Sequence, residues 1–293
     1  MDSLLRKYCE KRKIVLRKGE NFHILLTLAW NRVLLFKLKL HKWLHGIKKP
    51  IVHYYAVCWN EEKMLPFMFQ YYDQFVDHYT IYDNYSDDNS ESIIRSHKNA
   101  DIKKFSMEGG INDYIYQEIK NNCWKCSRGK ADWVIVCDID ELVYCGDIEQ
   151  MLSALKYEGY SIVKPIGFNM YSEHYPQFSF TRPITEIIKT GVRNDMMDKC
   201  VLFNPYAIVE INYKPGAHEC HPWGRVKKYH SDDVKMLHYK NIGLEQLLER
   251  TRSYAVRLSK ENIENNYGAE YLKKEQLIIK EFTENEQKAS VII

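Results

Sequence analysis

Residues 133–141 read WVIVCDIDE, and this stretch decides which fold and which chemistry the chain is expected to have. Its first five residues are apolar, as is typical of a buried strand. Asp138 and Asp140 follow at alternate positions, so both side chains point the same way. Such close carboxylates beside an apolar strand repel each other unless a cation neutralises them, and Mg²⁺ and Mn²⁺ prefer oxygen ligands. The pattern predicts a divalent metal site at this pair. The alternatives are a cap for a helix starting near Asp147, or ion pairs with nearby lysines and arginines.

Strand-like and helical patterns alternate on the N-terminal side of this stretch. Short apolar runs predict strands, and apolar residues at helical spacing predict helices between them. Such alternation implies βαβ crossovers, so we expect an α/β fold with a mostly parallel, Rossmann-like sheet flanked by helices. The expected strands cover residues 51–58, 78–82, 102–105 and 133–137, and the expected helices cover 64–75, 90–97 and 113–126.

The pattern changes after Asp147. Residues 171–213 are rich in Tyr, Phe, Thr, Ile and Val without a helical period, which predicts an antiparallel or irregular region. The last thirty residues read as one charged helix and a tail. The other elements expected here are a helix at 148–155, strands at 161–166 and 234–237, and a helix at 244–258 that carries Arg250, Arg252 and Arg257.

Charge is distributed unevenly along the chain. Residues 1–50 hold 13 Lys and Arg against three acidic residues, a net charge of +10, which leaves −7 for the rest of a chain whose total is +3. A basic segment interleaved with apolar residues predicts contact with an anionic membrane surface or an acidic glycolipid, and the body has no basic patch that would indicate nucleic acid. The alternative is a helix that packs on the body through Leu34, Leu35, Leu38 and Leu40.

The apolar stretch at 24–36 is interrupted by polar residues and is shorter than a bilayer span. The N-terminus also lacks the pattern of a secretory signal. We therefore expect a cytoplasmic protein, held peripherally on the inner face of the plasma membrane if residues 1–50 bind lipid. Without a signal, the eight cysteines are expected to be buried thiols rather than disulfides.

The run from Asn60 to Ser90 (NEEKMLPFMFQYYDQFVDHYTIYDNYSDDNS), followed by WVIVCDIDE, resembles the family-2-like glycosyltransferases of the GT-A fold. It is most similar to a bacterial subgroup whose first strand ends in Asn-Glu and whose metal motif is D-x-D-E, and it also resembles the family 92 enzymes. The resemblance covers residues 51–145 well and 238–254 loosely. Residues 1–50 and 146–235 match nothing in these families. Together with the charge and pattern described above, we expect a GT-A catalytic domain at 51–260, with a nucleotide-sugar half at 51–145 and an acceptor-side half at 146–260. A basic amphipathic extension at 1–50 is expected before it, and a C-terminal helix and tail at 261–293 after it.

The resemblance also implies a reaction and a set of site residues. The donor would be a nucleoside-diphosphate-sugar, with UDP favoured, and the acceptor a saccharide or lipid-linked glycan in the synthesis of capsule, O-antigen or lipopolysaccharide. Asp83 would hold the base or ribose, Asp138 the ribose or the metal, and Asp140 the Mn²⁺ or Mg²⁺ that bridges the donor phosphates. His238 would complete the metal shell. The implied donor-binding residues are Asn60, Glu61, Asp83, Gln117, Asn121, Asp138 and Lys240, with Arg193 and Lys199 as further cations for the diphosphate.

An inverting transferase needs a general base, and the sequence leaves its identity open. His218 follows a glycine-containing turn and ranks first, ahead of Asp198, Glu219 and Glu173. A retaining enzyme would need no such base. Two other functions are alternatives: a nucleotidyltransferase, although Asn60-Glu61-Glu62 stands where that class carries a basic loop, and a non-catalytic saccharide-binding protein rich in aromatic residues.

Overall fold

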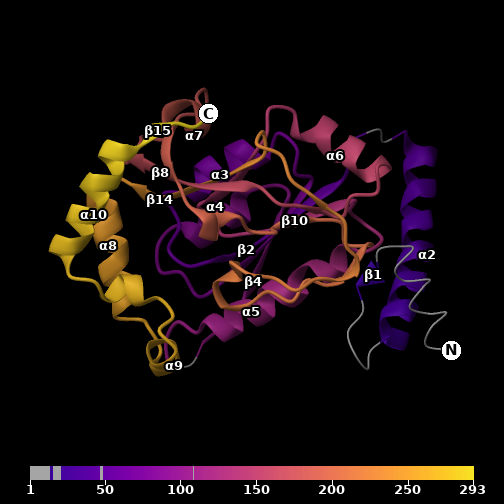
Figure 1. Cartoon of the computed structure of the whole chain (residues 1–293), viewed down its shortest axis with the longest axis horizontal. Coiled ribbons are helices and arrows are strands. Elements are labelled where there is room, and N and C mark those ends of the chain that lie inside the picture. The colour runs from indigo at the N-terminus through magenta and orange to yellow at the C-terminus, as the bar shows by residue number, and fades with distance from the viewer. Residues whose placement is uncertain (1–13, 16–20, 47–48, 108) are drawn as a thin grey trace.

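The computed structural model describes residues 14–15, 21–46, 49–107 and 109–293. A seven-stranded sheet runs through the centre of the body (Figure 1). Neighbouring strands from β4 to β5 are parallel, and β10 is antiparallel to the strands on both sides of it, so the predicted α/β fold with a mostly parallel sheet is confirmed. The strand order is β13 (Lys228–Tyr229), β7 (Ile162–Val163), β10 (Leu202–Phe203), β5 (Trp133–Val136), β2 (Val52–Cys58), β3 (His78–Asp83) and β4 (Ala100–Lys104).

Helices cover both faces of this sheet, which explains why its central strand, β5, is apolar at every position. In β5, Trp133 and Ile135 pack into the larger core, and Val134 and Val136 pack into a second core on the opposite face. The larger core includes side chains of α3 (Leu65–Tyr72), α4 (Ser90–Ser96) and α6 (Ile148–Tyr157). The second core is built against α5 (Asp113–Asn122) and the 3₁₀ turn η1 (Cys123–Ser127).

A second sheet stands beside the first, and the turn after β5 joins the two. Strand β6 (Glu141–Tyr144) begins immediately after Asp140 and lies at the edge of this sheet. Its antiparallel neighbour is β14 (Lys235–Ile242), which runs parallel to β8 (Ile166–Ser172). The remaining strands are β9 (Thr190–Arg193) and β15 (Ser290–Val291). The irregular region predicted for 171–213 contains the end of β8, strands β9, β10 and β11 (Ile208–Glu210), α7 (Ile184–Ile187) and η2 (Asp195–Met197).

The C-terminal segment forms more helices than the sequence predicted. Where one charged helix was expected, the chain forms α9 (Lys260–Glu264), η4 (Ala269–Leu272) and α10 (Glu275–Lys288). Ile278 and Phe282 of α10 pack against Tyr171 of β8 and Leu247 of α8 (Leu244–Ala255). Helices α8 and α10 therefore close one end of the molecule (Figure 1).

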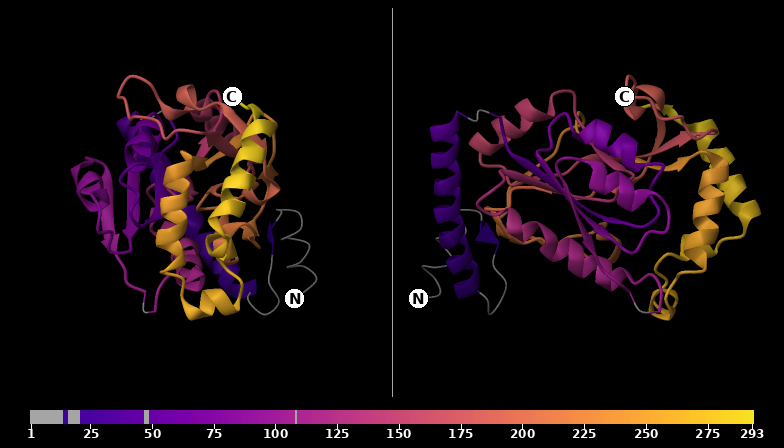
Figure 2. Two further views of the ribbon diagram at one scale, coloured as in Figure 1. Left: turned by 90° about the vertical axis from the view of Figure 1, so that its left-hand side faces the viewer. Right: turned by 180° about the vertical axis from the view of Figure 1, so that it is seen from behind.

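Helix α2 (Asn21–His45) lies at the opposite end, as Figure 2 shows from behind. Asn31 donates a hydrogen bond to the Tyr206 carbonyl (3.2 Å), and Lys42 forms an ion pair with the buried Asp132. Beside the helix, β1 (Ile14–Val15) pairs with β12 (Trp223–Arg225). None of the helices in the described ranges combines the length and apolarity that crossing a bilayer requires.

Candidate active site

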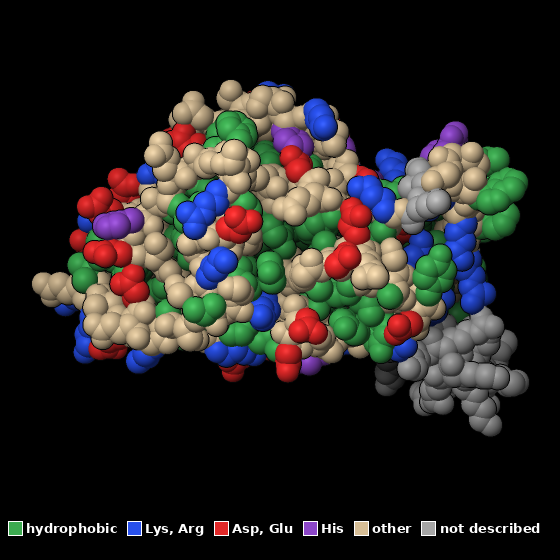
Figure 3. Space-filling model, turned by 90° about the horizontal axis from the view of Figure 1, so that it is seen from above, with side chains coloured by type: hydrophobic (Ala, Val, Ile, Leu, Met, Phe, Trp, Pro, Cys, Tyr) green, Lys and Arg blue, Asp and Glu red, His purple; other side chains and the backbone are tan. Residues whose placement is uncertain are grey.

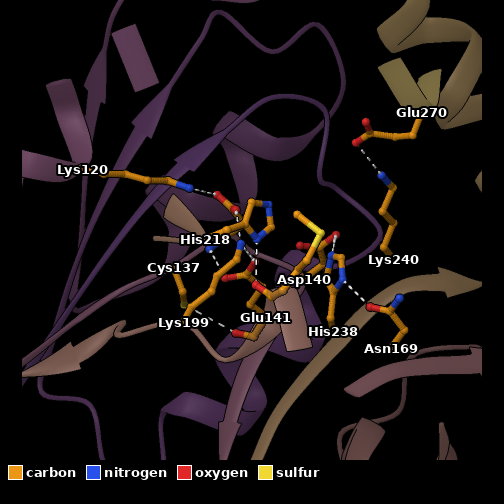
Figure 4. A network of polar contacts seen from close by, with 12 residues as sticks. Lys120, Cys137, Asp140, Glu141, Asn169, Lys199, His218, His238, Lys240 and Glu270 are labelled. Atoms are coloured by element: carbon orange, nitrogen blue, oxygen red, sulfur yellow. Dashed lines mark hydrogen bonds and ion pairs between the residues drawn. The ribbon is translucent and has the colours of Figure 1, made fainter. Parts of the chain in front are cut away.

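Asp138 and Asp140 lie in the turn that joins the two sheets. The Glu141 amide donates to the Asp138 carbonyl (3.1 Å), and the Tyr239 amide of β14 donates to the Asp140 carbonyl (2.8 Å). Because β14 pairs with β6 in this register, His238 lies beside the turn, and its Nε2 is 3.7 Å from Asp140 Oδ2. The structure thus brings two of the predicted metal ligands together (Figure 4).

A third residue orients the His238 ring. His238 Nδ1 lies 3.0 Å from Oδ1 of Asn169, its register partner on β8. Since this amide oxygen accepts, Nδ1 carries a proton, and Nε2 is the ring nitrogen that faces Asp140. A histidine whose second nitrogen is held in this way is typical of metal ligands.

This donor set fits a small divalent cation. Among the described residues no three His, Cys, Asp or Glu side chains converge as a metal cluster. Mg²⁺, however, is commonly held by one or two carboxylates, with water and substrate phosphates as the other ligands. Asp140 and His238 would be the protein ligands. When bound, the cation would offset negative charge that develops on a diphosphate leaving group.

Arg250 of α8 is the site residue that sequence reasoning missed most clearly. Its guanidinium lies 3.0 Å from Asp140 and 3.0 Å from Glu61, bridging two carboxylates from different parts of the chain. Burial favours the neutral form of Asp140, but Arg250 and His238 outweigh it and hold the pKa of Asp140 well below its usual range. Burial raises the pKa of Glu61 to about 8 despite Arg250. The only signal for Arg250 was its place on the arginine-bearing helix at 244–258.

Two buried lysines flank Asp138. Lys120 Nζ lies 2.6 Å from Asp138 Oδ1, and Lys199 Nζ lies 3.9 Å from Oδ2 and 2.5 Å from Glu141. Burial opposes ionisation of Asp138, but these two lysines keep its pKa lowered. The two lysines are only 6% and 3% exposed, so they place fixed positive charge next to the carboxylates. Nothing in the sequence around Lys120 indicated this role.

Two cavities meet at this cluster. The larger, about 530 Å³, runs past the end of β2 and the β5–β6 turn to the 214–219 segment and η4. The smaller, about 430 Å³, lies between residues 59–64 and α8. Trp59, Glu61, Asp140, Lys240 and Arg250 line both. These volumes are in the range of pockets that bind small molecules.

His218 lines the larger cavity and has the geometry of a proton acceptor. Its Nδ1 lies 2.8 Å from the Met196 carbonyl, so Nδ1 carries the proton and Nε2 is left as an acceptor. Burial and the nearby Lys199 lower the pKa of His218, which keeps the ring neutral at pH 7. Gly216 has φ +75°, and a Cβ at this position would lie 2.8 Å from the ring, so a glycine is needed here.

Gln117 and Asn121 support the segment that carries His218. Gln117 Nε2 donates to the Tyr213 carbonyl (2.6 Å), and Asn121 Oδ1 accepts from the Tyr213 amide (2.7 Å). These two predicted donor-binding residues of α5 therefore hold a neighbouring loop. Of the two, Gln117 also lines the larger cavity.

A comparison of protein-family profiles assigns the chain. The profile described as Glycosyl transferase family 2 matches residues 56–207, or 152 of 293 residues. The chain belongs to glycosyl transferase family 2. This confirms the family that the D-x-D-E motif indicated, and the mixed sheet of this family 2 chain agrees with the expected GT-A architecture. No protein among curated sequences matches it.

Three solved structures that are similar to the family 2 chain share little sequence with it. TarS from S. aureus is 12% identical with a TM-score of 0.40, and its fragment 1–349 is 11% identical with a TM-score of 0.39. The matches cover 70% and 71% of this chain but 39% and 65% of the TarS chains. A mycobacterial protein is 12% identical with a TM-score of 0.28, over 41% of either chain.

Some of the other predicted site residues line the two cavities and others do not. Lys240 lines both cavities, with Nζ 3.4 Å from Glu270, and Asn60 lines the smaller one. Glu219 lines the larger cavity but is exposed and pairs with His221 (2.8 Å). Three other predicted residues line neither cavity. Asp198 accepts a hydrogen bond from the Gly167 amide and forms an ion pair with Arg193. Glu173 is exposed, and Asn121 contacts Tyr213.

Asp83 is fully buried and its carboxylate is engaged by its own turn. It accepts from the Ser86 hydroxyl (2.6 Å) and amide (3.1 Å), and it pairs with Lys104 (2.5 Å). It lines neither cavity. A contact between Asp83 and the donor of the family 2 enzyme stays a prediction.

We expect Asp83→Asn to lower stability more than donor affinity. Losing charge from a buried, hydrogen-bonded pair typically costs about 1–3 kcal/mol, which thermal unfolding will show as a lower midpoint. Lys104→Gln removes the other partner of the pair and should cause a similar loss. A ten- to hundredfold loss of donor affinity at an unchanged midpoint would instead place Asp83 at the nucleotide.

Proposed function

We propose that this protein transfers a sugar from a nucleoside-diphosphate-sugar, with UDP favoured, to a saccharide or lipid-linked glycan acceptor, with a divalent metal bound at Asp140 and His238. The observation that carries the proposal is the larger cavity, where carboxylates, buried lysines and a neutral histidine face one space. Membership of glycosyl transferase family 2 supports the reaction class.

The charges around the cavity suit a diphosphate. Lys120 and Lys199 pair with Asp138, and Arg250 pairs with Asp140, so fixed positive charge lies next to both carboxylates. Preorganised charge of this kind stabilises negative charge as it develops on a leaving group, and it needs no reorganisation during the reaction.

His218 supplies the base of an inverting reaction in this proposal. The acceptor hydroxyl oxygen forms a bond to the anomeric carbon and gives its proton to His218 Nε2. The bond from the anomeric carbon to the phosphate oxygen breaks, and its electron pair leaves with the nucleoside diphosphate. A ring that is neutral at pH 7 can accept this proton. The D-x-D-E resemblance favours an acceptor from surface polysaccharide synthesis.

A donor screen tests the proposal. We expect UDP-sugars with Mn²⁺ to raise the unfolding midpoint by about 5 °C at a hundred times Kd, because binding to the folded state stabilises it by mass action. Chelation should remove the shift, and slow donor hydrolysis should release UDP. GDP- and CMP-sugars, measured under the same conditions, show whether the shift depends on the nucleotide of the donor. If no sugar nucleotide shifts the midpoint, or if the shift persists in EDTA, the donor or the metal assignment fails.

A further inference from the structure

Helix α2 has two apolar faces, and only one of them contacts the body. Ile24 and Leu28 pack with Val209, and Leu38 is also buried. Together with the Asn31 and Lys42 contacts described above, this face fixes the helix to the end of the sheet. The helix is therefore an integral part of the folded body.

The second face of α2 is exposed, and we call it the outward face. From Phe22 to Trp43 its members recur every three or four residues, so they form one stripe along the helix, opposite the buried side chains. Figure 3 shows hydrophobic and basic side chains gathered on the end of the molecule that α2 forms. The outward face comprises Phe22 (75% exposed), Leu26 (54%), Trp30 (59%), Val33 (45%), Phe36 (67%), Leu40 (44%), Trp43 (78%) and Leu44 (63%). A contiguous stripe of large apolar residues on a soluble surface marks an interaction site.

Charge identifies the kind of partner. Residues 21–45 contain no acidic residue, and Arg32, Lys37 and Lys39 are exposed on the helix. The wider segment 1–50 carries +10, whereas the rest of the chain carries −7. Apolar residues flanked by cations, with tryptophans among them, are typical of helices that lie in the interface of an anionic membrane.

We propose that the outward face of α2 docks on the surface of an anionic phospholipid bilayer, with the helix axis in the plane of the membrane. A second copy of the chain is a poorer partner, because two such helices would bring together only positive charges. The helix lies on the bilayer and does not span it, since its other face is occupied by the body and it is not apolar enough to cross.

This docking also orients the enzyme. The residues that line the larger cavity include Arg250 and Tyr254 of α8, and α8 lies at the end of the molecule away from α2 (Figures 1 and 2). A bilayer against the outward face would hold the site away from the lipid. The acceptor end of a glycan would then have to extend from the membrane to reach it.

Sedimentation of the full-length chain with vesicles tests the proposal. We expect binding to vesicles of phosphatidylglycerol and phosphatidylcholine at 0.1 M salt, and much weaker binding to phosphatidylcholine alone or near 1 M salt, where the Debye length falls from ~10 Å to ~3 Å. Trp30→Glu with Phe36→Glu should reduce the partition coefficient at least tenfold. Replacing Arg32, Lys37 and Lys39 by Gln should reduce it roughly fivefold per residue on anionic vesicles only.

A matched variant controls for added charge. Phe180→Glu with Val291→Glu makes the same change at exposed positions on the body (89% and 74% exposed) and should bind as the wild type does. Donor hydrolysis in solution should be equal in all variants, so the outcome does not depend on the proposed function. The proposal is overturned if the wild type stays in the supernatant, if the outward-face variant still pellets, or if light scattering shows a dimer that this variant dissociates.

Discussion

Asp140→Asn should lower kcat/KM by about a thousandfold or more, with the fold intact. The substitution keeps the size of the side chain but removes the charge that faces both His238 and Arg250. Loss of a metal-binding carboxylate removes charge stabilisation of the leaving group, and a thousandfold corresponds to about 4 kcal/mol of transition-state stabilisation. The Mn²⁺-dependent thermal shift should vanish together with transfer.

Asp101→Asn is the matched control for this variant. Asp101 is an exposed carboxylate on β4 that pairs with His78, so its loss should leave transfer within about twofold of wild type. Asp138→Asn should resemble Asp140→Asn and leave Lys120 without its partner. Wild-type rates in the Asp140 variant, or full activity in excess chelator, would refute the metal role.

His218→Ala should lower kcat by about 10²- to 10⁴-fold and leave donor affinity nearly unchanged, because general-base catalysis contributes that much to a transfer step. The pH profile separates a base from a residue that only supports the loop. Wild-type kcat/KM should fall as pH drops through the pKa of His218, which lies below the ordinary 6.5, since protonation removes the acceptor lone pair. The variant should lose this acid limb.

His221→Ala is the control for the second variant. His221 is exposed and lies three residues further along the same segment, and its side chain forms an ion pair with the surface residue Glu219. Its rate and pH profile should match those of the wild type. If His218→Ala keeps the acid limb, or if Glu219→Gln abolishes it, the base is another group.

The local pattern of the sequence was sufficient to predict the central fold. In β5 every position is apolar because alternate side chains enter two cores, one on each side of the sheet. The motif that follows it predicted the family, because the turn at Asp138 and Asp140 is specified by consecutive residues. Elements after residue 147 were less predictable, since short antiparallel strands depend on partners far away in the chain.

Tertiary structure decided the rest of the candidate site. Arg250 lies 110 residues from Asp140 along the chain, and Asn169 lies 69 residues from His238, so only the packing of α8 and the register of β14 bring these side chains together. The sequence predicted that Asp83 contacts the nucleotide-sugar donor, because it follows a strand. In the folded chain its carboxylate is bound by Lys104 and Ser86.

Helix α2 shows the same division between what sequence and structure decide. Its composition alone determined a basic, apolar segment without acidic residues. Leu38 and Leu40 were equal candidates for packing on the body, yet Leu38 is buried and Leu40 is 44% exposed. The hydrophobic effect favours burial of an apolar side chain, but it has no direction. The face of α2 that packs on the protein is therefore determined by its contacts with Val209, Tyr206 and Asp132 of the body.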